Sequence, residues 1–230
     1  MARDNSPQVR QKNNLARHNE RLRSTKDRIL IVTEGSKTEP QYFNDMRKEL
    51  RVSAASIAVM PSALGTSPLQ VVQYARQILV HGDRNKGIER RSFEKVYAVF
   101  DRDDHKSYRE ALELAGSLNL AVKNDVGQLV EFQAVASIPN FELWILLHFQ
   151  DVFSAYDRDK VLSLLLDAFP GYAKGSLKVY GVTRHLLQDA IGRAELLARM
   201  YSPFSDPQPY TGVVNLVKTL ISSRDRADRI

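Results

Sequence analysis

Two short apolar segments constrain the fold of this chain more than any other feature. Residues 28–33 and 95–100 are continuous runs rich in β-branched and aromatic side chains, and each is followed at once by a carboxylate. Such runs are typical of strands buried on both faces of a parallel sheet. A helical pattern follows each run, so the sequence predicts strands and helices that alternate along the chain.

The remaining segments extend this alternation. Further strands are predicted at 56–60, 120–123 and 129–137. Helices are predicted at 38–51, 67–82, 106–117, 140–149, 157–168, 183–201 and 211–223. We therefore predict an α/β fold in which helices flank a mostly parallel sheet and additional C-terminal helices pack on it.

Two of the predicted helices begin with the spacing of a capping box. Thr38 and Ser67 each stand three residues before a glutamine, so each hydroxyl can bond the first turn of its helix. Pro40 falls in the first turn of the earlier helix, and Gly82 is a natural end for the later one.

Length and composition suit one globular unit of 230 residues, with 43% hydrophobic and 26% charged side chains. The absence of cysteine excludes disulfides, thiolate zinc sites and a cysteine nucleophile. No apolar run approaches the ~20 residues of a membrane span, and the N-terminus lacks the apolar core of a secretory signal. We expect a cytoplasmic protein that contacts no membrane. Its expected parts are a basic arm at 1–27 and a domain at 28–225, with a core at about 28–150 and a helical part at about 151–225.

Most of the positive charge belongs to the N-terminal arm. The chain carries a net charge of +6, and residues 1–28 contribute +5 of it. Basic arms of this kind often contact phosphates, and a solvated tail is the alternative. The candidate nucleic-acid-binding residues of the arm are Arg10, Lys12, Arg17, Arg21, Arg23 and Lys26.

Carboxylates follow both of the buried-type strands. Glu34 ends the first strand, and Asp101 and Asp103 end the second. Because ligands of open parallel sheets bind outside the carboxyl ends of the strands, we expect these three side chains to converge there. Three carboxylates at one point repel each other unless a cation lies between them, and oxygen ligands favour Mg²⁺ or Mn²⁺. The alternative is that the aspartates cap the next helix and Glu34 is an exposed turn residue.

Four segments in this order resemble motifs of the RloB-like family, whose core looks like a Toprim domain. Residues 29–43, ILIVTEGSKTEPQYF, are similar to the opening motif I-L-I-V-x-E-G-x-x-T-E-x-x-Y-F. Residues 99–105, VFDRDDH, are similar to V-F-D-x-D-x-H, and residues 137–149 are similar to S-N-P-x-F-E-L-W-x-L-L-H-F. Residues 209–217 resemble a closing motif. The chain departs from the family at Ile138, where the family has Asn, and at Asn140, where Cys is common.

The resemblance implies a role for each matched position. Glu34, Asp101 and Asp103 would be metal ligands and catalytic residues, with Glu34 alternatively a general base or acid. Glu39 and Glu142 could hold a second metal ion, and Glu142 is also a catalytic candidate. For Glu39 the alternative is a favourable anion in the first turn of a helix, and for Glu142 it is a structural ion pair.

Three basic side chains are further candidates near these carboxylates. Lys37 could stabilise the transition state of phosphoryl transfer, as could Lys174, and Lys37 is preferred because it shares a loop with Glu34. His105 could orient a ligand or transfer a proton, and the alternative is a loop histidine without such a role. For Lys37 the alternative is an ordinary solvated lysine. His148 and Trp144 are expected to be structural.

For the whole protein the resemblance implies a Toprim-type nuclease that needs Mg²⁺ or Mn²⁺ and cleaves phosphodiester bonds of DNA or RNA. It also implies a part in antiphage defence or abortive infection, beside an ABC-like or AAA-type ATPase. A homo-oligomer is left open. The alternative is a catalytically inactive Toprim-like module that binds nucleic acid or regulates a partner ATPase.

We predict that the basic arm adds affinity for nucleic acid and takes no part in chemistry. Deletion of residues 1–24 should weaken nucleic-acid binding and reduce its dependence on salt, because fewer phosphates are neutralised. Fluorescence anisotropy with a labelled oligonucleotide over a series of salt concentrations measures both quantities. An unchanged affinity and salt slope would make the arm a tail or a protein-docking segment.

Overall fold

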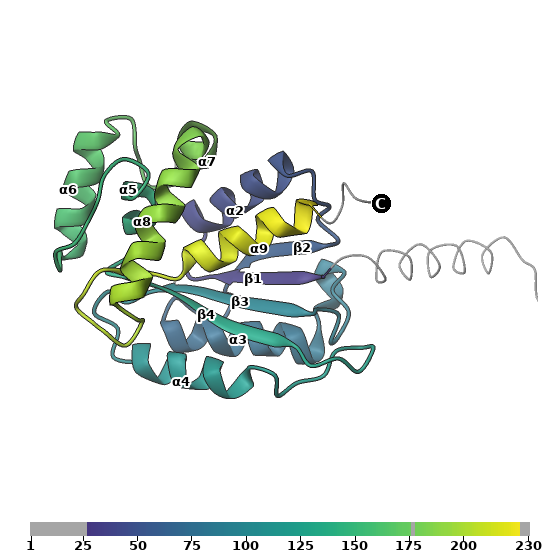
Figure 1. Cartoon of the computed structure of the whole chain (residues 1–230). Helices are drawn as coiled ribbons and strands as arrows, with labels where there is room; N and C mark the ends of the chain where they lie inside the picture. The colour runs from purple at the N-terminus through teal and green to yellow at the C-terminus, as the bar shows by residue number, and fades with distance from the viewer. Residues whose placement is uncertain (1–26, 176–177, 226–230) are drawn as a thin grey trace, which may run out of the picture.

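A five-stranded sheet organises the structure, a computed structural model that describes residues 27–175 and 178–225. The strand order is β2-β1-β3-β4-β5 (Figure 1). The first four strands are parallel, and the short β5 pairs antiparallel to β4. The strands are β1 (Ile29–Thr33), β2 (Ile57–Pro61), β3 (Lys95–Asp101), β4 (Glu131–Ile138) and β5 (Tyr210–Thr211).

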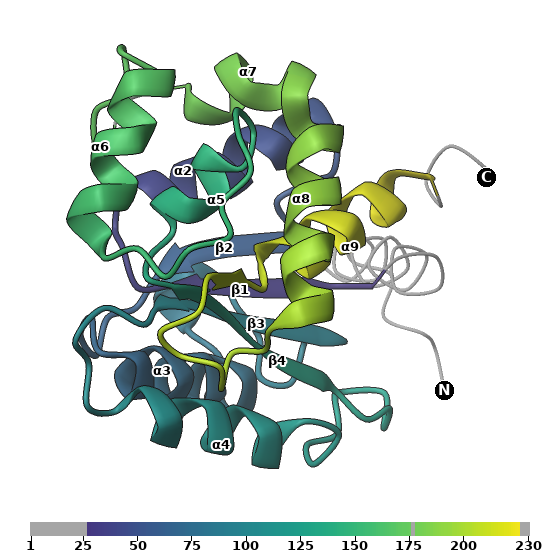
Figure 2. The same ribbon diagram turned by 60° about the vertical axis from the view of Figure 1, so that its left-hand side comes forward.

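Helices cover both faces of the sheet, as predicted. Figure 2 shows α3 and α4 below the sheet and the remaining α-helices above it. The α-helices are α2 (Thr38–Glu49), α3 (Pro68–His81), α4 (Tyr108–Leu118), α5 (Glu142–Leu146), α6 (Arg158–Ala168), α7 (Val179–Thr183), α8 (Leu187–Met200) and α9 (Val213–Asp225). Two 3₁₀ turns, η1 (Arg84–Lys86) and η2 (Arg184–Leu186), complete the elements of the described residues.

The period-2 alternation of the central strands divides the core into two layers. In β1, Ile29 and Ile31 face the layer formed with α2 and the C-terminal helices, whereas Leu30 and Val32 face α3 and α4. All four side chains are fully buried. This two-sided burial explains why the strand has no polar positions before its last residue.

The C-terminal helices share the upper layer with the N-terminal half of the chain. Trp144 and His148 are buried there with Tyr42 of α2, and the Trp144 and His148 rings are 5.2 Å apart. Both residues are structural, as expected. Burial lowers the pKa of His148 to about 4, so this imidazole is neutral at physiological pH. None of the helices in the described ranges has both the length and the apolar character that crossing a bilayer requires.

The later of the two predicted capping boxes is confirmed and the earlier one is wrong. Ser67 and Gln70 form the reciprocal bonds of the box, and Gly82 ends α3 at φ 70°. At the earlier helix the N-cap is Lys37, and no side chain caps it. Thr38 is instead the first helical residue, and its Oγ1 accepts a hydrogen bond of 3.0 Å from the Gly175 backbone N–H. A long-range contact therefore replaces the local one.

Several predicted boundaries also differ. Residues 120–123 form no strand, because Leu120 has a positive φ of 55° and only Lys123 makes a bridge, to Leu129. The helix predicted at 140–149 is regular only in α5. The helix predicted at 183–201 begins at Leu187, after α7 and η2, and the segment predicted as helix from 211 first forms the end of β5. Pairing of β5 with β4 fixes that start.

We predict that Ser67→Ala lowers the free energy of unfolding by about 1 kcal/mol, because it removes a side-chain cap from α3. Ser107→Ala is the matched control, since Ser107 is the N-cap of α4 but makes no side-chain cap bond. Urea unfolding of both variants measures the difference. Equal effects of the two substitutions would contradict this role of Ser67.

Candidate active site

A carboxylate pocket lies at the carboxyl edge of the sheet. Glu34 follows β1, Asp101 ends β3, and Glu142 begins α5 shortly after β4. Because β1, β3 and β4 are adjacent and parallel, their ends meet at one edge. The pocket has a volume of ≈ 310 Å³ and contains every acidic site residue expected from the sequence, together with Lys37. Its lining residues include Glu34, Lys37, Glu39, Asp101, Asp103, Glu142, Arg158 and Lys174.

Glu34 connects β1 to β3 through its side chain. Its Oε2 accepts a hydrogen bond of 3.0 Å from the Asp101 backbone N–H, and its Oε1 lies 3.4 Å from His105 Nε2. Burial raises the pKa of Glu34, which the Asp101 backbone bond and His105 oppose. Glu34 is therefore a fixed, partly desolvated carboxylate and not an exposed turn residue.

Asp101 and Asp103 differ in their surroundings. Burial, followed by the charges of Glu39 and Glu34, raises the pKa of Asp101 well above its usual range. Asp103 has a positive φ of 31°, and its Oδ2 lies 3.0 Å from Arg158. Its Oδ1 is buried and has no hydrogen-bond partner among the described residues. Burial raises the pKa of Asp103, and Arg158 opposes that rise.

Glu39 folds back over the loop that follows β1. A Cβ on Gly35 would lie 2.2 Å from Glu39 Oε2, so only glycine allows this close approach. The side chain of Glu39 is buried, and burial with the charges of Glu142 and Glu34 raises its pKa. Glu39 therefore lines the pocket, and it is also an acidic residue in the first turn of α2, as its alternative interpretation required.

The loop before α7 holds Glu142 in place. Glu142 is only 2% exposed. Its Oε1 accepts a hydrogen bond of 3.0 Å from Tyr172 Oη and forms an ion pair of 3.2 Å with Lys174 Nζ. Gly175 follows with φ 73°, and a Cβ there would lie 2.8 Å from Lys37 Cδ. Together with its bond to Thr38, Gly175 closes the loop against the start of α2.

Two of the pocket's neighbours were not predicted from the sequence. Arg158 reaches Asp103 from the first residue of α6, and Tyr172 reaches Glu142 from the loop that follows α6. The sequence around Arg158 indicates only the start of α6, where Asp157 caps the helix by accepting a hydrogen bond from the Lys160 N–H. Both contacts join residues far apart in the chain, and no spacing rule could reveal them. His105 and Lys174, which the sequence did suggest, both contact pocket carboxylates.

The carboxylates are paired with side chains of the chain itself. Glu34, Asp103 and Glu142 contact His105, Arg158 and Lys174 respectively. In this arrangement no three acidic or histidine side chains of the described ranges form a group that could hold a metal ion. The metal roles expected from the sequence therefore stay predictions. Two larger hollows, of ≈ 500 and ≈ 830 Å³, contain none of these carboxylates.

The candidate nucleic-acid-binding residues of the arm lie outside the described residues. These are Arg10, Lys12, Arg17, Arg21, Arg23 and Lys26.

Fold and site together define an α/β protein with an acidic pocket at the carboxyl edge of a mostly parallel sheet. The chain belongs to the RloB-like family: the family model described as RloB-like protein matches residues 29–220. This match includes every residue that lines the pocket. Comparison with curated proteins and with solved structures gave no match.

We predict that Asp101→Asn stabilises the metal-free protein at neutral pH. In the folded state the pKa of Asp101 is raised above its value of about 4 in an unfolded chain. Between these two values the folded state binds more protons, so the wild-type free energy of unfolding decreases as pH rises from about 4. Asparagine has nearly the same shape as aspartate but does not ionise, so the free energy of unfolding of the variant lacks this decrease with pH.

Urea unfolding in the presence of a chelator, followed by fluorescence of the single tryptophan Trp144, tests this prediction. The midpoint of the variant should exceed that of the wild type at about pH 7, and the difference should shrink towards about pH 4. Asp104→Asn, at the exposed neighbouring position, is the control. An equal or lower midpoint for Asp101→Asn at neutral pH would contradict the prediction.

Proposed function

We propose that this protein is a metal-dependent nuclease that hydrolyses phosphodiester bonds of DNA or RNA. The observation that carries the proposal is the single pocket in which five carboxylates lie beside Lys37, Arg158 and Lys174. Burial raises the pKa values of Glu34, Asp101 and Asp103, and clusters of such perturbed groups are typical of functional sites. His105 and Arg158 lie beside Glu34 and Asp103. Family membership supports the same class of reaction through the resemblance to Toprim domains.

The chemistry of the pocket fits a hard divalent cation. Its acidic donors are all carboxylate oxygens, and Asp103 Oδ1 is a buried acceptor that lacks a partner among the described residues. Glu34, Asp101 and Asp103 would hold Mg²⁺ or Mn²⁺, and Glu39 and Glu142 would hold a second ion. Bound there, the cation would supply Lewis-acid polarisation of a phosphoryl oxygen and neutralise developing charge.

The basic residues at the pocket are suited to binding the substrate phosphate. Arg158 and Lys174 are half exposed or more, at 50% and 57%, so both can turn from their carboxylates to a phosphate. Arginine can contact two phosphate oxygens at once. Lys37 lies at the start of α2, where it can stabilise negative charge on the phosphate oxygens.

Glu34 is the residue best placed to move a proton. Burial raises the pKa of its carboxyl group, which brings it closer to the pH at which it can both accept and return a proton. Its Oε1 faces His105 Nε2, a second group that can exchange protons. In this proposal Glu34 activates water when it is not held by the metal.

A second candidate function is a module that binds nucleic acid or a partner ATPase without cleaving. The observation that favours it is the pairing of Glu34, Asp103 and Glu142 with His105, Arg158 and Lys174. A pocket neutralised by its own side chains has less need of a metal ion.

Family membership also leads us to propose a role in antiphage defence or abortive infection, together with an ABC-like or AAA-type ATPase encoded nearby. Co-purification of such an ATPase from the native locus tests the partnership.

We predict that the full-length protein cleaves nucleic acid only with Mg²⁺ or Mn²⁺ and that Asp101→Asn reduces the rate about 100-fold or more. Labelled single-stranded DNA, double-stranded DNA and tRNA, each with and without a chelator, identify the substrate. Asp104→Asn is the matched control, because this neighbouring carboxylate is exposed and does not line the pocket. It should retain wild-type activity.

Arg158→Gln and Lys174→Gln extend the same experiment. Both should raise KM, because each removes a cation that binds the substrate phosphate. Weak or absent metal binding, together with no cleavage of any of the three substrates, would support the binding module. Cleavage that survives Asp101→Asn would place the active site elsewhere.

A further inference from the structure

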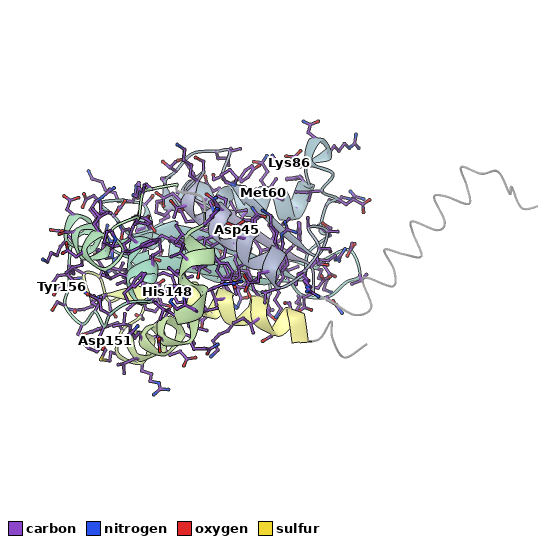
Figure 3. All side chains as sticks on the ribbon, turned by 90° about the horizontal axis from the view of Figure 1, so that it is seen from above. Asp45, Met60, Lys86, His148, Asp151 and Tyr156 are labelled. Carbon is purple, nitrogen blue, oxygen red and sulfur yellow. The ribbon has the colours of Figure 1, made fainter. Side chains whose placement is uncertain are left out.

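The amino end of the sheet carries a set of basic residues far from the carboxylate pocket. The loop between α3 and β3 and the loop between α4 and β4 both lie at this end (Figure 1, right). They are joined there, because Arg28 bonds Glu94 and Asp125, each at 2.6 Å. Figure 3 shows Lys86 of η1 at the opposite end of the molecule from Tyr156, which precedes α6.

Four cations of these two loops are exposed, and none forms an ion pair or a side-chain hydrogen bond with another described residue. They are Arg84, Arg90, Arg91 and Lys123, which we call the basic pole. The neighbouring carboxylates are engaged instead: Asp83 pairs with Lys86, and both Glu94 and Asp125 pair with Arg28. The two loops, residues 82–94 and 119–130, hold five cations against four carboxylates, so with Arg28 their formal charge is +2. The excess charge at this end is therefore positive, although Glu94 and Asp125 share a single arginine.

The backbone holds the arginines of the pole in place. Asp83 caps η1 and bridges to Ile88, and the Arg91 N–H donates to the Leu79 carbonyl at 2.6 Å. The Arg91 carbonyl in turn accepts a bond from the Asp125 N–H at 2.8 Å. A hollow of ≈ 830 Å³ is lined by His81, Arg84 and Arg90 and equally by Glu89 and Asp125. A broad, polar and open surface of this kind suits an extended polyanion better than a small apolar ligand.

We propose that the basic pole is a second, non-catalytic binding surface for the phosphate backbone of nucleic acid. This inference rests on the proposed function and extends it to the size of the substrate. The basic arm adds to the argument, because the chain enters β1 at this same pole through Asp27 and Arg28. The six candidate phosphate-binding residues of the arm precede this point in the sequence.

The distance between pole and pocket sets a minimum size for a nucleic acid that contacts both. The eight residues of β4 span about 26 Å at the usual rise per residue. At about 3.4 Å per base pair this equals roughly eight base pairs, before the loops are added. A duplex or folded strand of more than about ten base pairs is therefore the substrate class that uses the pole, whereas a short oligonucleotide reaches only the pocket.

The test compares two triple variants of the full-length protein that remove the same charge. Arg84→Gln with Arg90→Gln and Arg91→Gln alters the pole. Arg76→Gln with Arg109→Gln and Arg199→Gln, at exposed positions of α3, α4 and α8, is the matched control. The probes are fluorescein-labelled DNA and RNA duplexes of about 30 base pairs, which exceed the predicted span several-fold. Anisotropy over a range of salt concentrations gives the affinity and its salt slope.

The pole variant should bind either duplex about tenfold or more weakly, and its salt slope should fall by about two to three, near 0.9 for each phosphate that is no longer neutralised. The control should change affinity less than about twofold. Equal affinities and slopes for the two variants would overturn the inference while leaving the proposed nuclease activity intact. If the wild-type protein cleaves no nucleic acid but the pole variant still binds the duplexes more weakly than the control, the inference is upheld and the proposed nuclease activity is rejected.

Discussion

The crowding of carboxylates at the carboxyl edge of the sheet is the constraint on which the rest of the site depends. Glu34 and Asp101 are joined by a hydrogen bond across β1 and β3, and Glu39 and Glu142 lie close enough to raise the pKa values of neighbouring carboxyl groups. Collecting such groups in a partly desolvated pocket costs free energy unless positive charge compensates it. The chain supplies that charge from segments far along the sequence.

The C-terminal helical layer is therefore part of the site. Arg158 and Lys174 bring cations to Asp103 and Glu142, and Tyr172 donates a further hydrogen bond. The same layer shares one hydrophobic cluster with α2 and with one face of β1, β3 and β4. Packing thus fixes the position of these donors, and a change in that packing would alter the charge of the pocket.

The parts of the site that could be predicted are those that a short contiguous segment of the sequence determines. An apolar run that is followed by a carboxylate predicts both a buried strand and the place of that carboxylate. Because the ends of parallel strands share one edge of the sheet, Glu34 and Asp101 could be predicted to lie at that edge. The contact between Arg158 and Asp103 leaves no such local mark. The failed capping box shows the same limit, since Thr38 has the right spacing but bonds Gly175 from a distant loop.

The parallel sheet also separates charge along its own axis. Five carboxylates line the pocket where β1 and β3 end, whereas unpaired cations such as Arg84 and Arg90 lie among carboxylates of the amino end and leave it a small positive excess. If the proposed binding of nucleic acid holds, the amino end would attract the polyanion at long range and the ionised carboxylates of the pocket would repel it. That repulsion weakens only when cations neutralise the pocket, whether Arg158 and Lys174 or a divalent ion. In the proposed function, a phosphate would therefore enter the pocket only together with the neutralisation of its carboxylates, because each change lowers the electrostatic cost of the other.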